Sequence, residues 1–259
     1  MNALEYEMIE VLKSLKNDYG VFEIKAEFEA EGSRMEEMMR LKDVTSYVGL
    51  PIVLKIGGVE AVTDVYNALS IGVKGIIAPM VETPFALSKF LALIKNMIAE
   101  DNAKDIEFVF NMETITAYKN IDLIFELPDI FRLSGITVGR VDLVGSMGLS
   151  RDDINVSDDV FNICRETLVK AKRIGLKTGM GGGISTKAIP LIIRLGQEGL
   201  LDKFETRKVV FPISSWKYGE KAIPKAAGFE LLWLESKRRY YSRIKAEDEN
   251  RIAMLEVRL

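Results

Sequence analysis

Short runs of strand-forming residues alternate with helical patterns along most of the chain. The predicted strands cover residues 21–28, 51–56, 75–80, 106–113, 135–141, 176–180 and 207–211. Apolar residues at helical spacing recur over residues 3–17, 34–48, 59–71, 84–99, 118–127, 157–174 and 186–195. Such alternation predicts a parallel sheet with helices outside it, and 259 residues suit one (β/α)8 TIM-type barrel of the α/β class.

The pattern yields seven strands, whereas a (β/α)8 barrel has eight. Either a strand near the N-terminus is hidden in the pattern or the barrel is irregular there. The near-continuous apolar runs 52–54 and 76–78 indicate strands that are buried on both faces. We therefore expect one barrel domain over residues 1–259.

The C-terminal residues 226–259 differ from the rest, because they are highly charged and helical in pattern. Two arrangements remain open for this extension. It is either a terminal helix on its own barrel or a helix that packs on a neighbouring subunit in a homo-oligomer.

The composition limits the chemistry, because the chain has no histidine and only one cysteine, Cys164. Catalysis by Ser-His-Asp or Cys-His groups, histidine metal ligands and thiolate zinc clusters are excluded. Catalysis must therefore use Lys, Arg, Asp, Glu, backbone amides or oxygen-bound metals. Cys164 lies in a helical pattern, so we expect a buried structural thiol.

Charge and hydropathy give no sign of nucleic acid or membrane as a partner. The net charge is −3, and no apolar run approaches the length that spans a bilayer. The N-terminal residues lack the pattern of a secretory signal. Together with the single thiol, these features predict a cytoplasmic protein.

Charged residues alternate with apolar ones along the first predicted strand. Its charged residues are Glu23, Lys25, Glu27 and Glu29. Because side chains of a strand alternate between its two faces, all four charges share one face. If the apolar set meets the helices, the charges face the barrel interior, where they need partners or a metal.

The other strand ends also carry polar residues. In chain order these are Lys55, Glu82, Asn111, Glu113, Arg140 and Asp142, followed by the glycine-rich run 179–183. A single strand-end charge is usually a solvated loop residue. Active sites of α/β barrels lie at this end of the strands, however, so the set predicts one ring of functional groups.

Within this ring, Glu113 and Asp142 are the candidate metal ligands. Two carboxylates with water and substrate oxygens suit Mg²⁺ or Mn²⁺, which act as Lewis acids on a carbonyl or enolate oxygen. The candidate catalytic residues are Lys25, Glu27, Lys55, Glu82 and Arg140, and the candidate substrate-binding residues are Asn111, Gly181 and Gly182.

Two features of the loops have alternative interpretations. The glycine run 179–183 either lets backbone amides approach an anion or allows tight packing without a ligand. Arg151 either begins a solvated helix or contacts substrate. Gly57-Gly58 is interpreted as a simple turn.

Three motifs resemble the citrate lyase beta-subunit and class II pyruvate aldolase family, within the phosphoenolpyruvate/pyruvate barrel superfamily. The motifs are Gly75-Ile-Ile-Ala-Pro-Met-Val-Glu-Thr, Asn111-Met-Glu-Thr and Gly139-Arg-Val-Asp-Leu-Val-Gly-Ser-Met-Gly-Leu. The resemblance extends over residues 23–211. It implies a modified (β/α)8 barrel, which often exchanges its last helix between subunits.

The resemblance also implies making or breaking of a carbon–carbon bond next to a metal-bound enolate. Glu113 and Asp142 match the family's metal-binding glutamate and aspartate, and Glu82 matches an acidic residue of citrate lyase-like members. Two positions depart from the family. Lys55 replaces an arginine that holds the substrate, and residues 27–32 lack a histidine linked to proton transfer in the aldolases.

These observations favour a metal-dependent lyase or aldolase acting on a small 2-oxo acid such as pyruvate. An acyl-CoA lyase or phosphoenolpyruvate-type enzyme is the first alternative, although no clear basic site for the phosphates of coenzyme A is visible. A non-catalytic barrel that binds a metabolite is the second alternative, because of the two departures.

Overall fold

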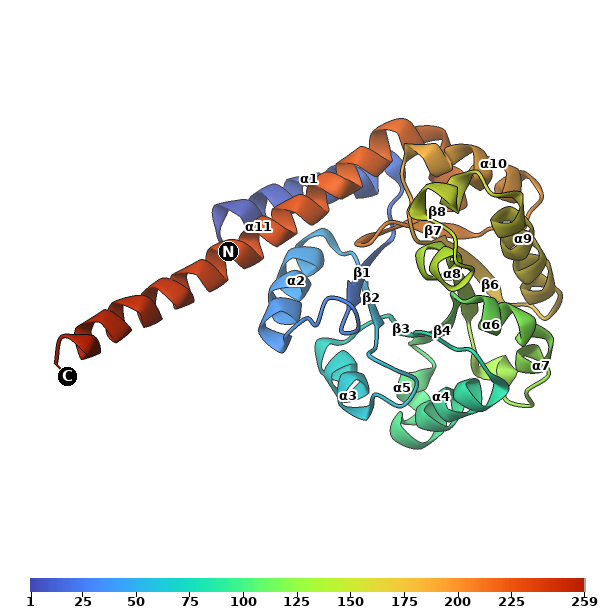
Figure 1. Ribbon diagram of the computed structural model, residues 1–259, viewed down its shortest axis with the longest axis horizontal. Helices are drawn as coiled ribbons and strands as arrows, with labels where there is room; N and C mark the ends of the chain where they lie inside the picture. The colour runs from blue at the N-terminus through green and yellow to red at the C-terminus, as the bar shows by residue number, and fades with distance from the viewer. Residues whose placement is uncertain (259) are drawn as a thin grey trace.

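The structure, a computed structural model that describes residues 1–258, is a closed barrel of eight strands (Figure 1). The strands are β1 (Glu23–Glu27), β2 (Ile52–Lys55), β3 (Gly75–Ala78), β4 (Glu107–Met112), β5 (Gly135–Gly139), β6 (Lys177–Gly181), β7 (Lys203–Glu205) and β8 (Val209–Pro212). They follow one another around the barrel in chain order. The predicted barrel class is confirmed.

Helices surround the barrel (Figure 1). The α-helices are α1 (Ala3–Tyr19), α2 (Met35–Val48), α3 (Val62–Ile71), α4 (Pro84–Met97), α5 (Glu100–Ala103), α6 (Ile115–Lys119), α7 (Ile121–Phe125), α8 (Arg140–Ser146), α9 (Asp158–Arg173), α10 (Ile189–Gln197) and α11 (Gly219–Glu256). Short 3-10 helices are η1 (Ile130–Arg132), η2 (Arg151–Asn155), η3 (Thr186–Ala188) and η4 (Ile213–Tyr218). Local capping explains several boundaries. Asn2 and Glu5 form a capping box at the start of α1, and Thr83 caps α4 ahead of Pro84.

The last strand corrects the prediction of an all-parallel sheet. Strands β1 to β7 pair in parallel with their sequence neighbours, but β8 is antiparallel to both β7 and β1. A tight hairpin at residues 206–208 connects these two strands, where a regular (β/α)8 barrel has a helix. The strand missing from the prediction is β7, not a strand near the N-terminus. It has three residues, too few to show a period.

The strands place apolar side chains outward and a mixed set inward. Ile24 and Ala26 of β1 belong to the main core between sheet and helices, as the period-two pattern predicted. Inside the barrel, a separate apolar cluster consists of Val53, Ile77, Val109 and Val210. We call this cluster the barrel plug. Because Val53 and Val109 lie two positions before the polar residues Lys55 and Asn111, the plug is one layer deeper than the strand ends.

The C-terminal helix α11 begins at Gly219, earlier than the predicted extension 226–259, of which Leu259 lies outside the described residues. It packs along α1 and then projects away from the barrel (Figure 1). Its buried residues include Phe229 and Trp233. Cys164 is buried in α9, as predicted. Over residues 1–258, the helices include none with the length and apolar character to cross a membrane.

A first prediction concerns Asp202, just before β7. Its carboxylate accepts hydrogen bonds from Lys172 Nζ at 2.6 Å and from the Thr178 amide at 2.7 Å. Burial opposes the charge, but these donors outweigh it and lower the pKa of Asp202. The folded state therefore gains stability above the unfolded-state pKa and loses it as pH falls through the lowered value. We expect Asp202→Asn to destabilise the protein at pH ~7 but much less at a pH below this lowered pKa.

Urea unfolding of both proteins at the two pH values measures this difference. If Asp202→Asn lowers the unfolding free energy by the same amount at both pH values, the lowered pKa of Asp202 does not contribute to stability and the prediction is wrong. The exposed pair Lys170–Asp122 supplies a control, because Asp122→Asn should have little effect at either pH.

Candidate active site

A cavity of about 640 Å³ opens at the carboxyl ends of the strands. Eight of the ten predicted site residues line it, namely Lys25, Glu27, Lys55, Asn111, Glu113, Asp142, Gly181 and Gly182. They come from four strands, from α8 and from the loops that follow the strands. The parallel strands bring these distant segments to one end of the barrel.

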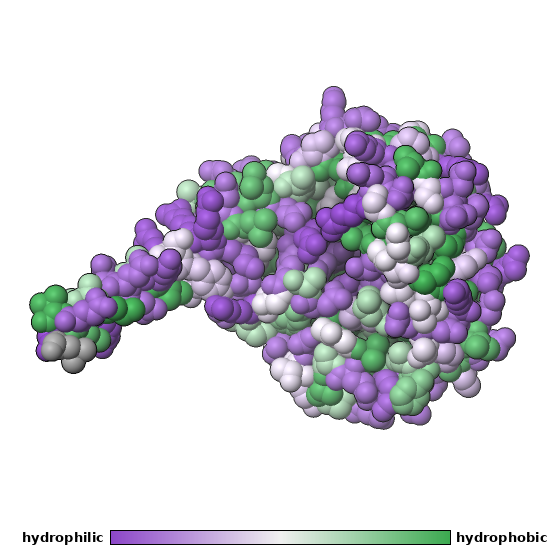
Figure 2. All heavy atoms as spheres, in the orientation of Figure 1, coloured by the Kyte–Doolittle hydropathy of each residue, from purple (hydrophilic) through white to green (hydrophobic). Residues whose placement is uncertain are grey.

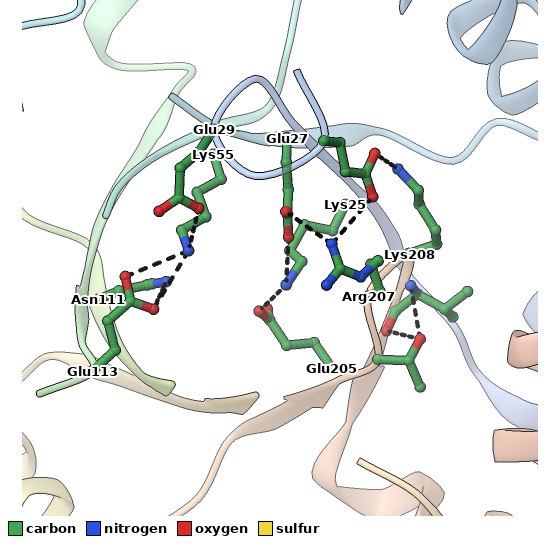
Figure 3. Close-up of polar contacts among 12 residues, drawn as sticks. Lys25, Glu27, Glu29, Lys55, Asn111, Glu113, Glu205, Arg207 and Lys208 are labelled. Carbon is green, nitrogen blue, oxygen red and sulfur yellow. Dashed lines mark hydrogen bonds and ion pairs between the residues drawn. The ribbon is translucent and has the colours of Figure 1, made fainter. Parts of the chain in front are cut away.

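Lys55 is the central cation on one side of the cavity (Figure 3). Its Nζ lies 2.8 Å from Glu29 Oε2 and 3.4 Å from each carboxylate oxygen of Glu113. Burial opposes the charge on Lys55, but Glu113 and Glu29 outweigh burial and raise its pKa. Lys55 is therefore an ammonium cation at neutral pH.

Glu113 is 2% exposed and is held from several directions. Besides Lys55, the Met80 amide donates to its Oε1 at 2.9 Å and Asn111 Nδ2 donates to its Oε2 at 3.1 Å. Burial raises the pKa of Glu113, although Lys55 and these donors act in the opposite direction. Met80 reaches Glu113 with a φ of 50°, a conformation that non-glycine residues rarely adopt. Such strain concentrates at functional sites.

Gly139 lies directly against Glu113, at the end of β5. A Cβ atom at this position would lie 2.5 Å from Glu113 Oε2 and 2.8 Å from its Cβ. Real Cβ atoms do not come this close, so only glycine leaves room for the carboxylate in its observed position.

A second ionic group surrounds Lys25, another lysine that lines the cavity (Figure 3). Lys25 Nζ lies 2.7 Å from Glu205 Oε1 and 3.5 Å from Glu27 Oε1. Arg207 approaches Glu27 from the hairpin at 3.6 Å. Burial opposes the charge on Lys25, but the two carboxylates outweigh it and raise its pKa. Burial likewise opposes the charge on Glu205, but Lys25 and Lys203 lower its pKa.

Arg140 and Glu82 do not line the cavity, and the roles predicted for them need correction. Arg140 is fully buried, and its guanidinium donates to the carbonyls of Gly181, Gly182 and Ile154 and to Asn155 Oδ1. Arg140 therefore joins the glycine run to the 3-10 helix η2. Glu82 accepts a hydrogen bond from Thr114 Oγ1 at 2.8 Å and so braces the turn after Glu113.

Asp142 lies on α8, because β5 ends at Gly139 rather than at Val141. The side chain is exposed and lines the same cavity as Glu113. Arg151, at the start of η2, is also exposed and lines the cavity, which agrees with both of its interpretations.

The glycine run shows tight packing at the edge of the cavity. Gly182 has a φ of 73°, and a Cβ there would lie 2.6 Å from the backbone nitrogens of Arg140 and Val141. The carbonyls of Gly181 and Gly182 accept from Arg140. Gly181, Gly182 and Gly183 all line the cavity as well, so close packing and access to a ligand occur in one segment.

The donors in the cavity fit a hard divalent cation. Glu113, Asp142 and Asn111 present only oxygen ligands, and Asn111 Oδ1 is buried without a hydrogen-bond partner among residues 1–258. Magnesium commonly binds through one or two carboxylates plus water and substrate oxygens. The described chain contains no cluster of three or more His, Cys, Asp or Glu residues that would complete a metal shell alone.

Sequence reasoning missed four groups that contribute to this site: Glu205, Arg207, the Met80 amide, and Glu29 as the partner of Lys55. The alternation of the first strand placed Glu29 on the inner face, but it did not show that Glu29 pairs with Lys55. Glu205 belongs to the undetected strand β7. No sequence signal identifies the Met80 amide, because backbone conformation creates that contact.

Comparisons with known proteins agree with the barrel fold. Residues 35–178 match the HpcH/HpaI aldolase/citrate lyase family model. Solved structures with the same fold include an HpcH/HpaI aldolase from Desulfitobacterium hafniense (15% identity, 78% of this chain and 82% of that chain, TM-score 0.60). Another is the citrate synthase SbnG (17% identity, 77% of this chain and 81% of that chain, TM-score 0.62). A third is CitE from Mycobacterium tuberculosis in complex with magnesium, acetoacetate and coenzyme A (14% identity, 83% of this chain and 78% of that chain, TM-score 0.54). No curated protein sequence matches the chain.

A prediction follows from the contact between Gly139 and Glu113. We expect Gly139→Ala to lower the unfolding free energy by about 1–3 kcal/mol, the usual range for overpacking, because Glu113 must move. Gly145→Ala in α8 is the matched control, since an added Cβ there meets no described atom within 4 Å. Urea unfolding measures both variants, and equal stability of the two would contradict the proposed clash.

Proposed function

The chain belongs to the HpcH/HpaI aldolase/citrate lyase family, and we propose that it is a metal-dependent carbon–carbon lyase or aldolase acting on a small 2-oxo acid. The observation that carries this proposal is that Glu113, Asp142 and Lys55 line one cavity at the carboxyl ends of the strands. Two carboxylates and a lysine at one barrel end suit a substrate that passes through an enolate.

Glu113 and Asp142 would hold Mg²⁺ or Mn²⁺, which supplies Lewis acidity toward the oxygens of a 2-oxo acid. Lys55 would place its positive charge near the enolate oxygen, in the role of the arginine that the family resemblance implies. Its ammonium gives charge without the two-pronged geometry of a guanidinium. Asn111 and the Gly181–Gly182 segment would contact the substrate from neighbouring strand ends.

Proton transfer is assigned to Lys25 and Glu27, because the chain has no histidine. Both residues line the cavity and are at least 90% buried. Glu27 would take up and return the proton. Lys25, held as a cation by Glu205, would balance the negative charge of Glu27 whenever that carboxylate is deprotonated. Arg151 and Lys187 are exposed residues of the cavity lining, so an acceptor with a second anionic group would fit there.

The test of this function is deuterium exchange into the methyl group of pyruvate, followed by proton NMR. Because exchange requires reversible formation of the enolate, we expect it with Mg²⁺ or Mn²⁺ and not after chelation. Glu113→Gln and Asp142→Asn should fold normally but lose metal binding and at least 100-fold in exchange rate, which corresponds to about 2.7 kcal/mol.

Glu107→Gln is a suitable control, because Glu107 starts β4, the strand that ends just before Glu113, and pairs with Lys177 at the opposite end of the barrel. It should retain exchange. Metal binding without exchange into pyruvate or any other small 2-oxo acid would contradict the proposal. Binding of coenzyme A under those conditions would favour an acyl-CoA lyase instead.

We also propose that α11 joins two copies of the chain. The helix has 38 residues and is therefore about 57 Å long. Apolar residues remain exposed on its projecting half and gather at its tip (Figure 2). They include Tyr240, Ile244, Ile252, Met254 and Leu255.

Charge favours an antiparallel pairing of two α11 helices. The basic residues Lys237, Arg238, Arg239, Arg243 and Lys245 precede the acidic residues Glu247, Asp248 and Glu249. Antiparallel alignment centred on Ala246 would bring Arg243 and Lys245 of one copy beside Glu249 and Glu247 of the other, with Tyr240 of one copy near Ile252 of the other. Like charges would meet in a parallel pair.

Light scattering after size-exclusion chromatography tests the pairing. We expect a mass of at least twice the 29.1 kDa of one chain, falling when Ile252 and Leu255 are both changed to Glu. The double change Glu220→Gln and Lys221→Gln, near the start of α11, is a control that should not alter the mass. A monomeric wild-type protein would contradict the proposal.

A further inference from the structure

The ammonium group of Lys55 lies between two carboxylates with different surroundings. The side chain of Glu113 is 2% exposed, whereas that of Glu29 is 25% exposed. Lys55 Nζ is 2.8 Å from Glu29 and 3.4 Å from Glu113 (Figure 3). Lys55 therefore already contacts a more accessible carboxylate while it still neutralises the buried one.

A divalent cation on Glu113 would lie beside this ammonium group. Like charges a few ångströms apart repel strongly where water is largely excluded. The aliphatic stem of lysine is flexible, so Nζ can move away from Glu113 without a change in the backbone. Glu29 is the closest carboxylate to receive it, since the two are already in contact.

We propose that the ammonium group of Lys55 neutralises Glu113 until a divalent metal binds there. The metal then displaces this group from Glu113, and Glu29 holds it. This inference rests on the proposed metal-dependent function. Without metal, Lys55 protects the structure from an unpaired buried carboxylate. With metal, the same ammonium group is released to face the substrate's developing negative charge. Glu29 is thus a positioning residue that acts through Lys55.

A different role for Glu29 would be direct ligation of the metal. Both roles predict weaker metal binding in Glu29→Gln. They differ when Lys55 is absent, because a positioning residue then has nothing to position, whereas a ligand still binds the metal. A double-mutant cycle separates the two roles.

The experiment is titration with Mn²⁺, with the free ion measured by electron paramagnetic resonance. We expect Lys55→Met to bind Mn²⁺ at least tenfold more tightly than the wild type, and Glu29→Gln at least fivefold more weakly. In the Lys55→Met background, adding Glu29→Gln should change the affinity less than twofold. Lys203→Met is the matched control, because Lys203 pairs with Glu23 inside the barrel but does not line the cavity. Its affinity should stay within twofold of wild type.

A thermal-melting readout accompanies the titration. Lys55→Met should melt at a lower temperature than wild type without metal, and saturating Mg²⁺ should raise its melting temperature by more. If Lys55→Met does not fold, Lys55→Gln keeps a neutral hydrogen-bond donor near Glu113 and takes its place with the same expectations.

The outcomes distinguish this inference from the proposed function. If neither the wild type nor the Lys55 variants bind Mn²⁺, the metal-dependent function is wrong and this inference with it. If Mn²⁺ binds but removal of Lys55 leaves the affinity unchanged or lower, the function stands and the displacement is wrong. An equal effect of Glu29→Gln in both backgrounds would overturn the role assigned to Glu29.

Discussion

The charged side chains inside the barrel must be neutralised, and the form of the site follows from that constraint. Lys25 lies between Glu205 and Glu27, and Lys55 lies between Glu113 and Glu29. Isolated charges that are buried to this extent would destabilise the fold by several kcal/mol each. Each lysine and its carboxylate partners therefore hold one another in position. The barrel plug, which lies one layer deeper in the barrel, supplies hydrophobic contact that a fully polar interior would lack.

Backbone constraints then determine where the key carboxylate lies. The Met80 amide reaches Glu113 from a left-handed conformation, and Gly139 leaves the space that the carboxylate occupies. Both restrict Glu113 to one position, which a metal or substrate site requires because small displacements of a ligand weaken binding and catalysis.

Much of this arrangement could be predicted, because barrel geometry converts sequence position into spatial position. The two-residue period of β1 correctly put Lys25 and Glu27 on the inner face and Ile24 in the core. Strand ends of parallel neighbours meet at one end of the barrel, so Asn111 and Gly181 share a cavity although they are far apart in sequence. The charge pairs themselves could not be predicted, since side-chain reach and loop conformation decide them.

The failures share a cause, which is that the chain changes direction without a strong local signal. Strand β7 is too short to show a period, and the hairpin after it reverses β8, so Glu205 escaped notice. At β5 the chain enters α8 immediately after Gly139, and this turns Arg140 away from the cavity into the space behind the glycine run. A charge at a predicted strand end is therefore informative only if the strand continues through it. Where a helix starts at that residue, the same charge can be buried as a clamp for the loops that form the site.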